Sequence, residues 1–159
     1  MGSYDHRPKV QVEGGLLASG SSREDAAGMK LLRDVAIRHL LTVSPKDTLR
    51  RAAKLMADRG IGSAVAVEDE QVAGIVTERD LLRAIAADQD VDETKVRDVM
   101  TVDVVSGAPG WDVVRAVRTM TEGGFRHLLV TEMNDPVGII SLRDLMDSMV
   151  ELVGKDESG

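Results

Sequence analysis

The stretch Gly74–Leu81 reads GIVTERDL, and 64 residues later the stretch Gly138–Leu145 reads GIISLRDL. In both copies an apolar run ends at a hydroxyl side chain, Thr77 or Ser141, and an Arg and an Asp follow. This order predicts a strand that runs into the start of a helix, because a hydroxyl is a preferred N-cap and an Asp three residues later suits the helix dipole. Capping explains the hydroxyl and the carboxylate, but it does not require the Arg.

The likeness between the two stretches belongs to a longer internal duplication. At the same offset of 64, residues 33–85 align with the later part of the chain without a gap. The triplet Arg-Asp-Val at residues 33–35 recurs at residues 97–99, and single matches include Pro45 with Pro109, Met56 with Met120, and Gly60 with Gly124. Such self-similarity indicates two copies of one structural unit.

Each copy predicts the same order of elements. A short helix (KLLRDVAI or TKVRDVM) leads to a brief strand (LLTV or DVVS) and then to an amphipathic helix. In the first copy this helix begins at Asp47 or Thr48 and ends at Gly60, and in the second it ends at Gly123-Gly124. Two apolar strands follow (SAVAVE and QVAGIV, or HLLVTE and PVGII), joined by a turn around Asp69-Glu70 or Asn134-Asp135, and a final helix closes the copy. The apolar stripes predicted on the amphipathic helices are Leu49, Ala52, Ala53 and Met56, and Val113, Ala116, Val117 and Met120, whereas Trp111 is expected at a surface or an interface.

Composition narrows the functional classes. The 159 residues carry a formal charge of −7, so the chain lacks the basic footprint of a nucleic-acid binder. There is no Cys, which excludes disulfides, thiolate metal sites and cysteine nucleophiles, and the three His residues are scattered. No secretory segment or long apolar run is present, so we expect a cytoplasmic protein without membrane contact. Residues 1–28 are rich in Gly, Ser and charge and predict a flexible N-terminal arm, in which only VQVEGGLLA is suited to join a sheet or a partner.

The repeated phrase has a chemical interpretation beyond capping. A helix start offers free N–H groups and a positive dipole end to a phosphate, while the hydroxyl and the Arg add donors. The Asp would repel a phosphate, but it is a natural acceptor for the two hydroxyls of a ribose. The order therefore favours a phosphate followed by a sugar, and the apolar runs GIGSAVAV and GGFRHLLV could border a base.

The chain resembles a tandem pair of CBS domains, the family named after cystathionine β-synthase. The resemblance covers residues 30–152 and rests on the repeated element order, the two closing phrases, VRDVM, and GGFRHLLV. It implies an α/β fold in which two CBS motifs pack through their sheets with pseudo-twofold symmetry. The predicted organisation is the arm at 1–28, CBS domains at 29–90 and 91–152, and a C-terminal tail at 153–159.

The resemblance also implies two clefts that bind adenine nucleotides, each with residues from both copies. In one cleft Asp144 would hold the ribose, with Ser141, Arg143, Arg126 and His127 near the phosphate. Thr42, Gly62 and Ser63 would line the adenine there. In the other cleft Asp80, Thr77 and Arg79 would take the ribose and phosphate roles. Ser106, Phe125 and Arg126 would border the base. Because Arg126-His127 carries more positive charge than Gly62-Ser63, we expect the Asp144 cleft to be the better phosphate site.

The predicted function is a noncatalytic regulatory module that senses AMP, ADP or ATP and signals through a homodimer or an unidentified effector protein. Glu78 and Asp80 are two residues apart and would not share a helix face, so they do not predict an acid and base pair. No cofactor or metal is required by this interpretation. The alternatives are a ligand-free structural or interaction module, and a module for another adenosyl ligand such as NAD, S-adenosylmethionine or a cyclic dinucleotide. Apolar residues in the final helices, DLLRAIAA and DLMDSMVELV, predict the homodimer.

Overall fold

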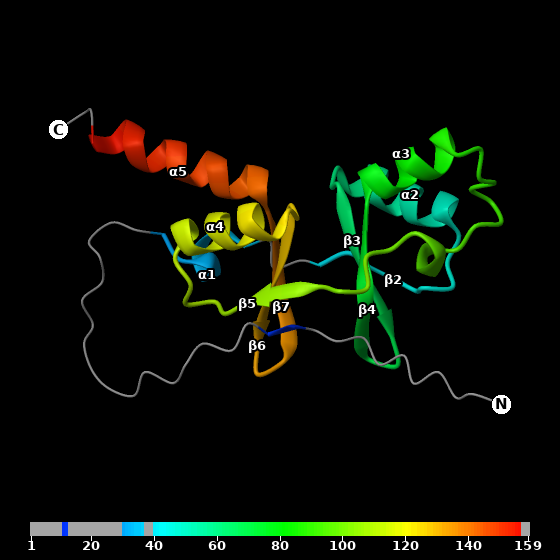
Figure 1. Ribbon diagram of the computed structural model, residues 1–159, viewed down its shortest axis with the longest axis horizontal. Helices are drawn as coiled ribbons and strands as arrows, with labels where there is room; N and C mark the ends of the chain where they lie inside the picture. The colour runs from blue at the N-terminus through cyan, green and yellow to red at the C-terminus, as the bar shows by residue number, and fades with distance from the viewer. Residues whose placement is uncertain (1–10, 13–29, 37–39, 157–159) are drawn as a thin grey trace. The chain divides into compact units, whose positions relative to one another are not determined.

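The computed structural model describes residues 11–12, 30–36 and 40–156, with side chains between Lys30 and Glu151. The chain forms two compact units, which are coloured mainly green and mainly yellow to red in Figure 1. The first unit contains Leu40–Val104, and the second contains residues 30–36 and 105–156. The predicted arm at 1–28 and tail at 153–159 lie outside the described residues, apart from Gln11–Val12 and the backbone to Asp156.

The first unit is a three-stranded sheet with helices packed on it. The sheet order is β2-β3-β4, with β2 parallel to β3 and β3 antiparallel to β4. Buried Leu49, Met56 and Val76 belong to the core between the sheet and its helices. The elements are β2 (Thr42–Val43), α2 (Leu49–Arg59), β3 (Ser63–Glu68), β4 (Gln71–Thr77), α3 (Glu78–Ala86) and the 3-10 turn η1 (Val96–Asp98).

The second unit repeats this arrangement and adds an edge strand. Its sheet order is β1-β5-β6-β7, with β5 parallel to β6 and β6 antiparallel to β7. The prediction that VQVEGGLLA can join a sheet is confirmed for the two residues of β1. The elements are β1 (Gln11–Val12), α1 (Leu32–Val35), β5 (Val105–Gly107), α4 (Val113–Gly123), β6 (His127–Glu132), β7 (Asp135–Ser141) and α5 (Leu142–Asp156).

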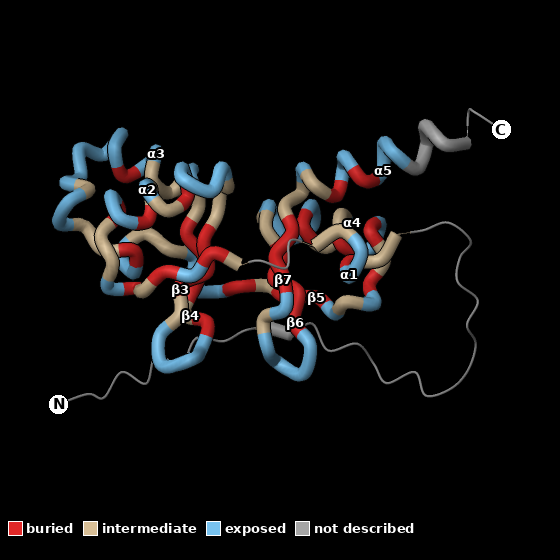
Figure 2. Tube along the Cα trace, turned by 180° about the vertical axis from the view of Figure 1, so that it is seen from behind, coloured by how far each residue is buried: buried red, intermediate tan, exposed pale blue. Residues whose placement is uncertain are grey.

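Caps and glycine stops set the ends of the two amphipathic helices, as the sequence predicted. The Thr48 hydroxyl accepts a hydrogen bond from the Arg51 amide at 3.2 Å, so Thr48 is the N-cap of α2. Both α2 and α4 end at a glycine in the left-handed region, Gly60 with φ 63° and Gly124 with φ 69°. The helices are thereby fixed in length, and each leads directly into a buried strand. Burial runs along the strands while the hairpin turns are exposed (Figure 2).

The structure corrects two predictions in the second copy, the first of them by a single residue. The turn between β6 and β7 lies at Met133-Asn134, whose φ values are 49° and 71°, and β7 begins at Asp135. This turn matches Asp69-Glu70 in the first copy, with φ values of 49° and 62°. Trp111, which was expected at a surface or an interface, is only 8% exposed and packs in the core of the second unit.

The leading segment of each sequence repeat packs in the unit of the other repeat. Leu32 lies in the leading segment of the first copy, yet it is fully buried in the core of the second unit. Its amide donates to the Trp111 carbonyl at 2.9 Å. Val96 lies in the leading segment of the second copy and is fully buried in the core of the first unit, where its amide donates to the Asp47 carbonyl at 2.9 Å. The predicted boundaries at 29–90 and 91–152 therefore describe the duplication in sequence, whereas each compact unit combines both repeats.

Candidate functional site

In the first unit the repeated phrase lies where β4 passes into α3. Ser63, at the start of β3, is directly opposite Thr77, at the end of β4. The amide of Glu78 donates to the carbonyl oxygen of Gly62 at 2.9 Å. These contacts bring Gly62, Ser63 and the phrase Thr77-Glu78-Arg79-Asp80 together, and we call this group the first helix start.

The second unit forms the same group where β7 passes into α5. His127, at the start of β6, is directly opposite Ser141, at the end of β7. The amide of Leu142 donates to the carbonyl oxygen of Arg126 at 2.8 Å. We call Arg126, His127 and the phrase Ser141-Leu142-Arg143-Asp144 the second helix start. The structure thus brings together, within each unit, the residues that the sequence assigned to the phosphate and the ribose.

Both helix starts form complete capping boxes. At the first, the Thr77 amide and hydroxyl each donate to Asp80 Oδ2 at 2.8 Å. The Asp80 amide approaches the Thr77 hydroxyl at 3.4 Å. At the second, the Ser141 amide and hydroxyl donate to Asp144 Oδ2 at 3.0 and 2.5 Å, and the Asp144 amide donates to Ser141 Oγ at 3.2 Å. The capping role of the phrase is confirmed in both copies.

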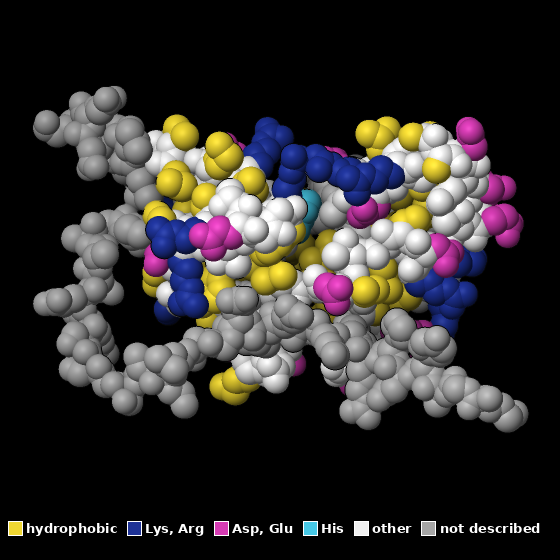
Figure 3. All heavy atoms as spheres, in the orientation of Figure 1, with side chains coloured by type: hydrophobic (Ala, Val, Ile, Leu, Met, Phe, Trp, Pro, Cys, Tyr) yellow, Lys and Arg dark blue, Asp and Glu magenta, His cyan; other side chains and the backbone are white. Residues whose placement is uncertain are grey.

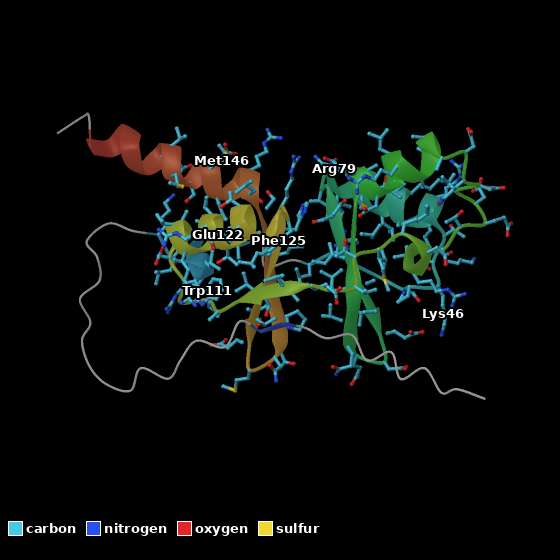
Figure 4. The ribbon with its side chains drawn as sticks, in the orientation of Figure 1. Lys46, Arg79, Trp111, Glu122, Phe125 and Met146 are labelled. Atoms are coloured by element: carbon cyan, nitrogen blue, oxygen red, sulfur yellow. The ribbon has the colours of Figure 1, made fainter. Side chains whose placement is uncertain are left out.

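Capping leaves part of each phrase available for other contacts. Within the described residues, the second oxygen, Oδ1, of Asp80 and of Asp144 accepts no hydrogen bond. Arg79 and Arg143 are exposed and form no ion pair with another described residue. Figure 4 shows Arg79 at the beginning of α3, with its side chain extending away from the helix. A cap uses one carboxylate oxygen, so among the described residues neither the Arg nor the other oxygen has a partner in the capping box.

The residues predicted to border the base differ in exposure. Thr42 on β2 is exposed, whereas its counterpart Ser106 on β5 is 1% exposed. The Ser106 hydroxyl has no hydrogen-bond partner among the described residues. Phe125 is half-buried and packs against the core of the second unit, with its ring edge over Gly123. The role of these residues beside a base stays a prediction.

Sequence reasoning gave no role in ligand binding to Glu78 and Leu142, the residues directly after the capping hydroxyls. The backbone of each contacts the residue that opens the neighbouring strand segment, Gly62 or Arg126. The sequence does show that the two phrases, TERD and SLRD, differ at this position, which carries a carboxylate in the first copy and an apolar side chain in the second. This difference could have drawn attention to the position.

Two further ion pairs lie on the surface of the first unit. Lys46 lies 2.8 Å from Glu68 on the exposed surface, and its hydrogen bond lowers the pKa of the Glu68 carboxyl. A hydrogen bond from Arg50 likewise lowers the pKa of Asp92, which fixes the loop after α3 to the start of α2. In the described part of the chain, no three acidic or His side chains are grouped to hold a metal ion. No helix among the described residues has the length and apolar character needed to cross a membrane.

Comparison with known proteins gives a consistent result. The sequence profile of the CBS domain matches twice, at residues 32–87 and 96–151. CBS domain-containing protein YhcV from Bacillus subtilis is 35% identical over 118 residues, which cover 74% of this chain and 84% of the relative. The crystal structure of the CBS-domain containing protein ATU1752 from Agrobacterium tumefaciens is similar with a TM-score of 0.70 and 31% identity, covering 75% of this chain and 92% of that one. The CBS domain protein PAE2072 from Pyrobaculum aerophilum, solved in complex with AMP, gives a TM-score of 0.68 at 25% identity, covering 79% and 99%.

Proposed function

Because the chain belongs to the CBS domain family and contains two CBS domains in tandem, we propose that it is a regulatory module that binds an adenine nucleotide without catalysing a reaction. The observation that carries this proposal is the set of hydrogen bonds made by the repeated phrase. In both units the capping box uses only one oxygen of the Asp, while the other oxygen and the adjacent Arg have no partner among the described residues. The complex of PAE2072 with AMP supports the choice of ligand class.

The second helix start has the chemistry for a nucleotide. The guanidinium groups of Arg126 and Arg143 are exposed and can donate to phosphate oxygens, as can the first amides of α5. Asp144 Oδ1 can accept from the ribose hydroxyls while Oδ2 keeps the cap. The proposed role of the module is to change the geometry or the partners of an assembly when the level of AMP, ADP or ATP changes.

Titration calorimetry with AMP, ADP and ATP tests this proposal. We expect binding with micromolar affinity or tighter, and a larger loss of affinity for Arg143→Ala than for Arg79→Ala. Arg79 and Arg143 occupy the same position in the two phrases, so each substitution serves as a control for the other. Absence of binding for all three nucleotides would refute the proposal. A thermal shift screen that adds NAD, S-adenosylmethionine and cyclic dinucleotides would then identify another adenosyl ligand or leave the interaction module as the function.

Exposed apolar side chains on the closing helices support an assembly of two copies. On α3, Leu82 is 66% exposed and Ile85 is 59% exposed, and the aligned positions on α5 are Met146 and Met149. Val150 adds to the α5 surface and is 71% exposed. Figure 3 shows hydrophobic atoms on the visible surface over α3 and α5, and Figure 4 marks Met146 on α5. We propose a homodimer that buries these faces, with signalling through the dimer or an effector protein.

A further inference from the structure

The two helix starts have opposite charge, although their backbones are equivalent. The amide of Glu78 donates to the carbonyl of Gly62 at 2.9 Å, and the amide of Leu142 donates to the carbonyl of Arg126 at 2.8 Å. One pair therefore places a carboxylate beside a glycine, whereas the aligned pair places an apolar side chain beside a guanidinium. The remaining charges, one Arg and one Asp in each phrase, are the same in both. The first helix start thus has a formal charge of −1 and the second has +1, with His127 neutral.

The carboxylate of Glu78 stays close to its own helix start. A Cβ added to Gly62 would lie 3.2 Å from both Cδ and Oε2 of Glu78, so the carboxylate covers the α-carbon of Gly62. Any larger side chain at position 62 would have to displace it. The absence of a side chain at Gly62 therefore leaves room for the Glu78 carboxylate. In the second unit the aligned position carries the Arg126 side chain. Glu78 is exposed, and no ion pair to another described residue neutralises it.

We propose that Glu78 determines ligand specificity at the first helix start. The carboxylate favours an adenosyl ligand with a neutral or positively charged 5′ substituent and disfavours a ligand with a 5′ phosphate. The proposal rests on the proposed function, because Thr77 and Asp80 keep there the geometry assigned to the ribose. A phosphate at this position would meet a carboxylate in place of the guanidinium of Arg126. A sulfonium or an amine would instead gain a favourable charge contact.

A pair of matched variants tests the role of Glu78. Glu78→Gln removes the charge and keeps the size of the side chain, and Glu93→Gln makes the same change on an exposed loop residue of the same unit. Calorimetry would use AMP, adenosine and S-adenosylmethionine as probes with the full chain. For the unmodified protein we expect one tight AMP site. Glu78→Gln should raise AMP affinity at the weaker site by at least about tenfold and lower the affinity for S-adenosylmethionine, while adenosine binding stays unchanged.

A second variant copies the second unit more fully. Glu78→Leu introduces the residue type found at the aligned position, Leu142. A double variant with Gly62→Arg also introduces a guanidinium at the position aligned with Arg126. We expect two AMP molecules to bind per chain in the double variant. Because the larger residue at position 62 could disturb the fold, thermal unfolding is followed in parallel, and Glu78→Leu alone remains a decisive variant.

The outcomes separate this inference from the proposed function. If the unmodified protein binds AMP through Arg143, but AMP binding is the same in Glu78→Gln, Glu78→Leu and Glu93→Gln, the role of Glu78 is wrong and the nucleotide site stands. An equal gain in Glu93→Gln would also overturn it, because the effect would then come from net charge. If no adenosyl ligand binds to any variant, the proposed function and the inference both fail.

Discussion

Asp144→Ala should separate the capping role of the phrase from its binding role. Asp144 Oδ2 accepts from the amide and the hydroxyl of Ser141, so the substitution removes two hydrogen bonds at the start of α5. Loss of a cap of this kind costs about 1 kcal/mol and should remain under about 2 kcal/mol, because Ser141 keeps its hydroxyl as the N-cap. Removal of the charged acceptor for the ribose should weaken AMP binding by about 1.5 to 3 kcal/mol, which is a factor of roughly 10 to 150.

The chain contains a matched control for this experiment. Asp98 Oδ2 accepts from the Lys95 amide at 2.9 Å, so Asp98 has a similar local role at the 3-10 turn η1 but no predicted ligand contact. Denaturant unfolding should show a comparable small loss of stability for Asp98→Ala and Asp144→Ala, and calorimetry should show a loss of AMP affinity only for Asp144→Ala. Unchanged affinity in Asp144→Ala would refute the ribose role, and an equal loss in Asp98→Ala would attribute the effect to stability.

Two further predictions concern packing and assembly. Gly74→Ala should destabilise the first unit by roughly 1 to 3 kcal/mol in denaturant unfolding, because a Cβ would lie 2.6 Å from the Thr101 carbonyl oxygen. Gly110→Ala, where the nearest atom is at 3.5 Å, should behave like the unmodified protein, and an equal effect of the two changes would contradict the argument. Leu82→Asp combined with Val150→Asp should convert the proposed dimer into a monomer by light scattering. A monomer mass for the unmodified chain at tens of micromolar would remove the dimer.

Much of the fold was predictable because local signals and burial agree. The apolar runs SAVAVE and HLLVTE became the strands Ser63–Glu68 and His127–Glu132, and the predicted glycine stops ended both preceding helices. The turn after HLLVTE was misplaced by one residue, because Asn and Asp are more common turn residues than Met. The structure nevertheless places Met133 at positive φ, since the register of β6 and β7 follows that of the first copy.

Burial of Trp111 could not be predicted from its neighbours in sequence. Its position before a helix suggests a surface residue, but Leu32, from a distant part of the chain, packs in the same core. The Arg115 guanidinium also lies over the ring, 3.9 Å from its centroid. At the candidate site the duplication identified the residues that are the same in both copies. The duplication could not predict a role for Glu78, which differs from the aligned Leu142, because the contact between Glu78 and Gly62 forms only in the folded chain.

The leading segment of each repeat packs in the unit of the other repeat. We therefore predict that a substitution in the first repeat destabilises the second unit. Leu32 has no exposed surface, so Leu32→Ala should cost about 2 to 5 kcal/mol through lost burial and a residual cavity. Hydrogen exchange should then show reduced protection in β6 and β7 with little change in β3 and β4. Val96→Ala, at the aligned position in the second repeat, should give the reverse pattern, because Val96 packs in the core of the first unit. If Leu32→Ala instead exposed β3 and β4, each repeat would fold as its own unit. The expected pattern of protection would mean that neither repeat forms a complete core alone.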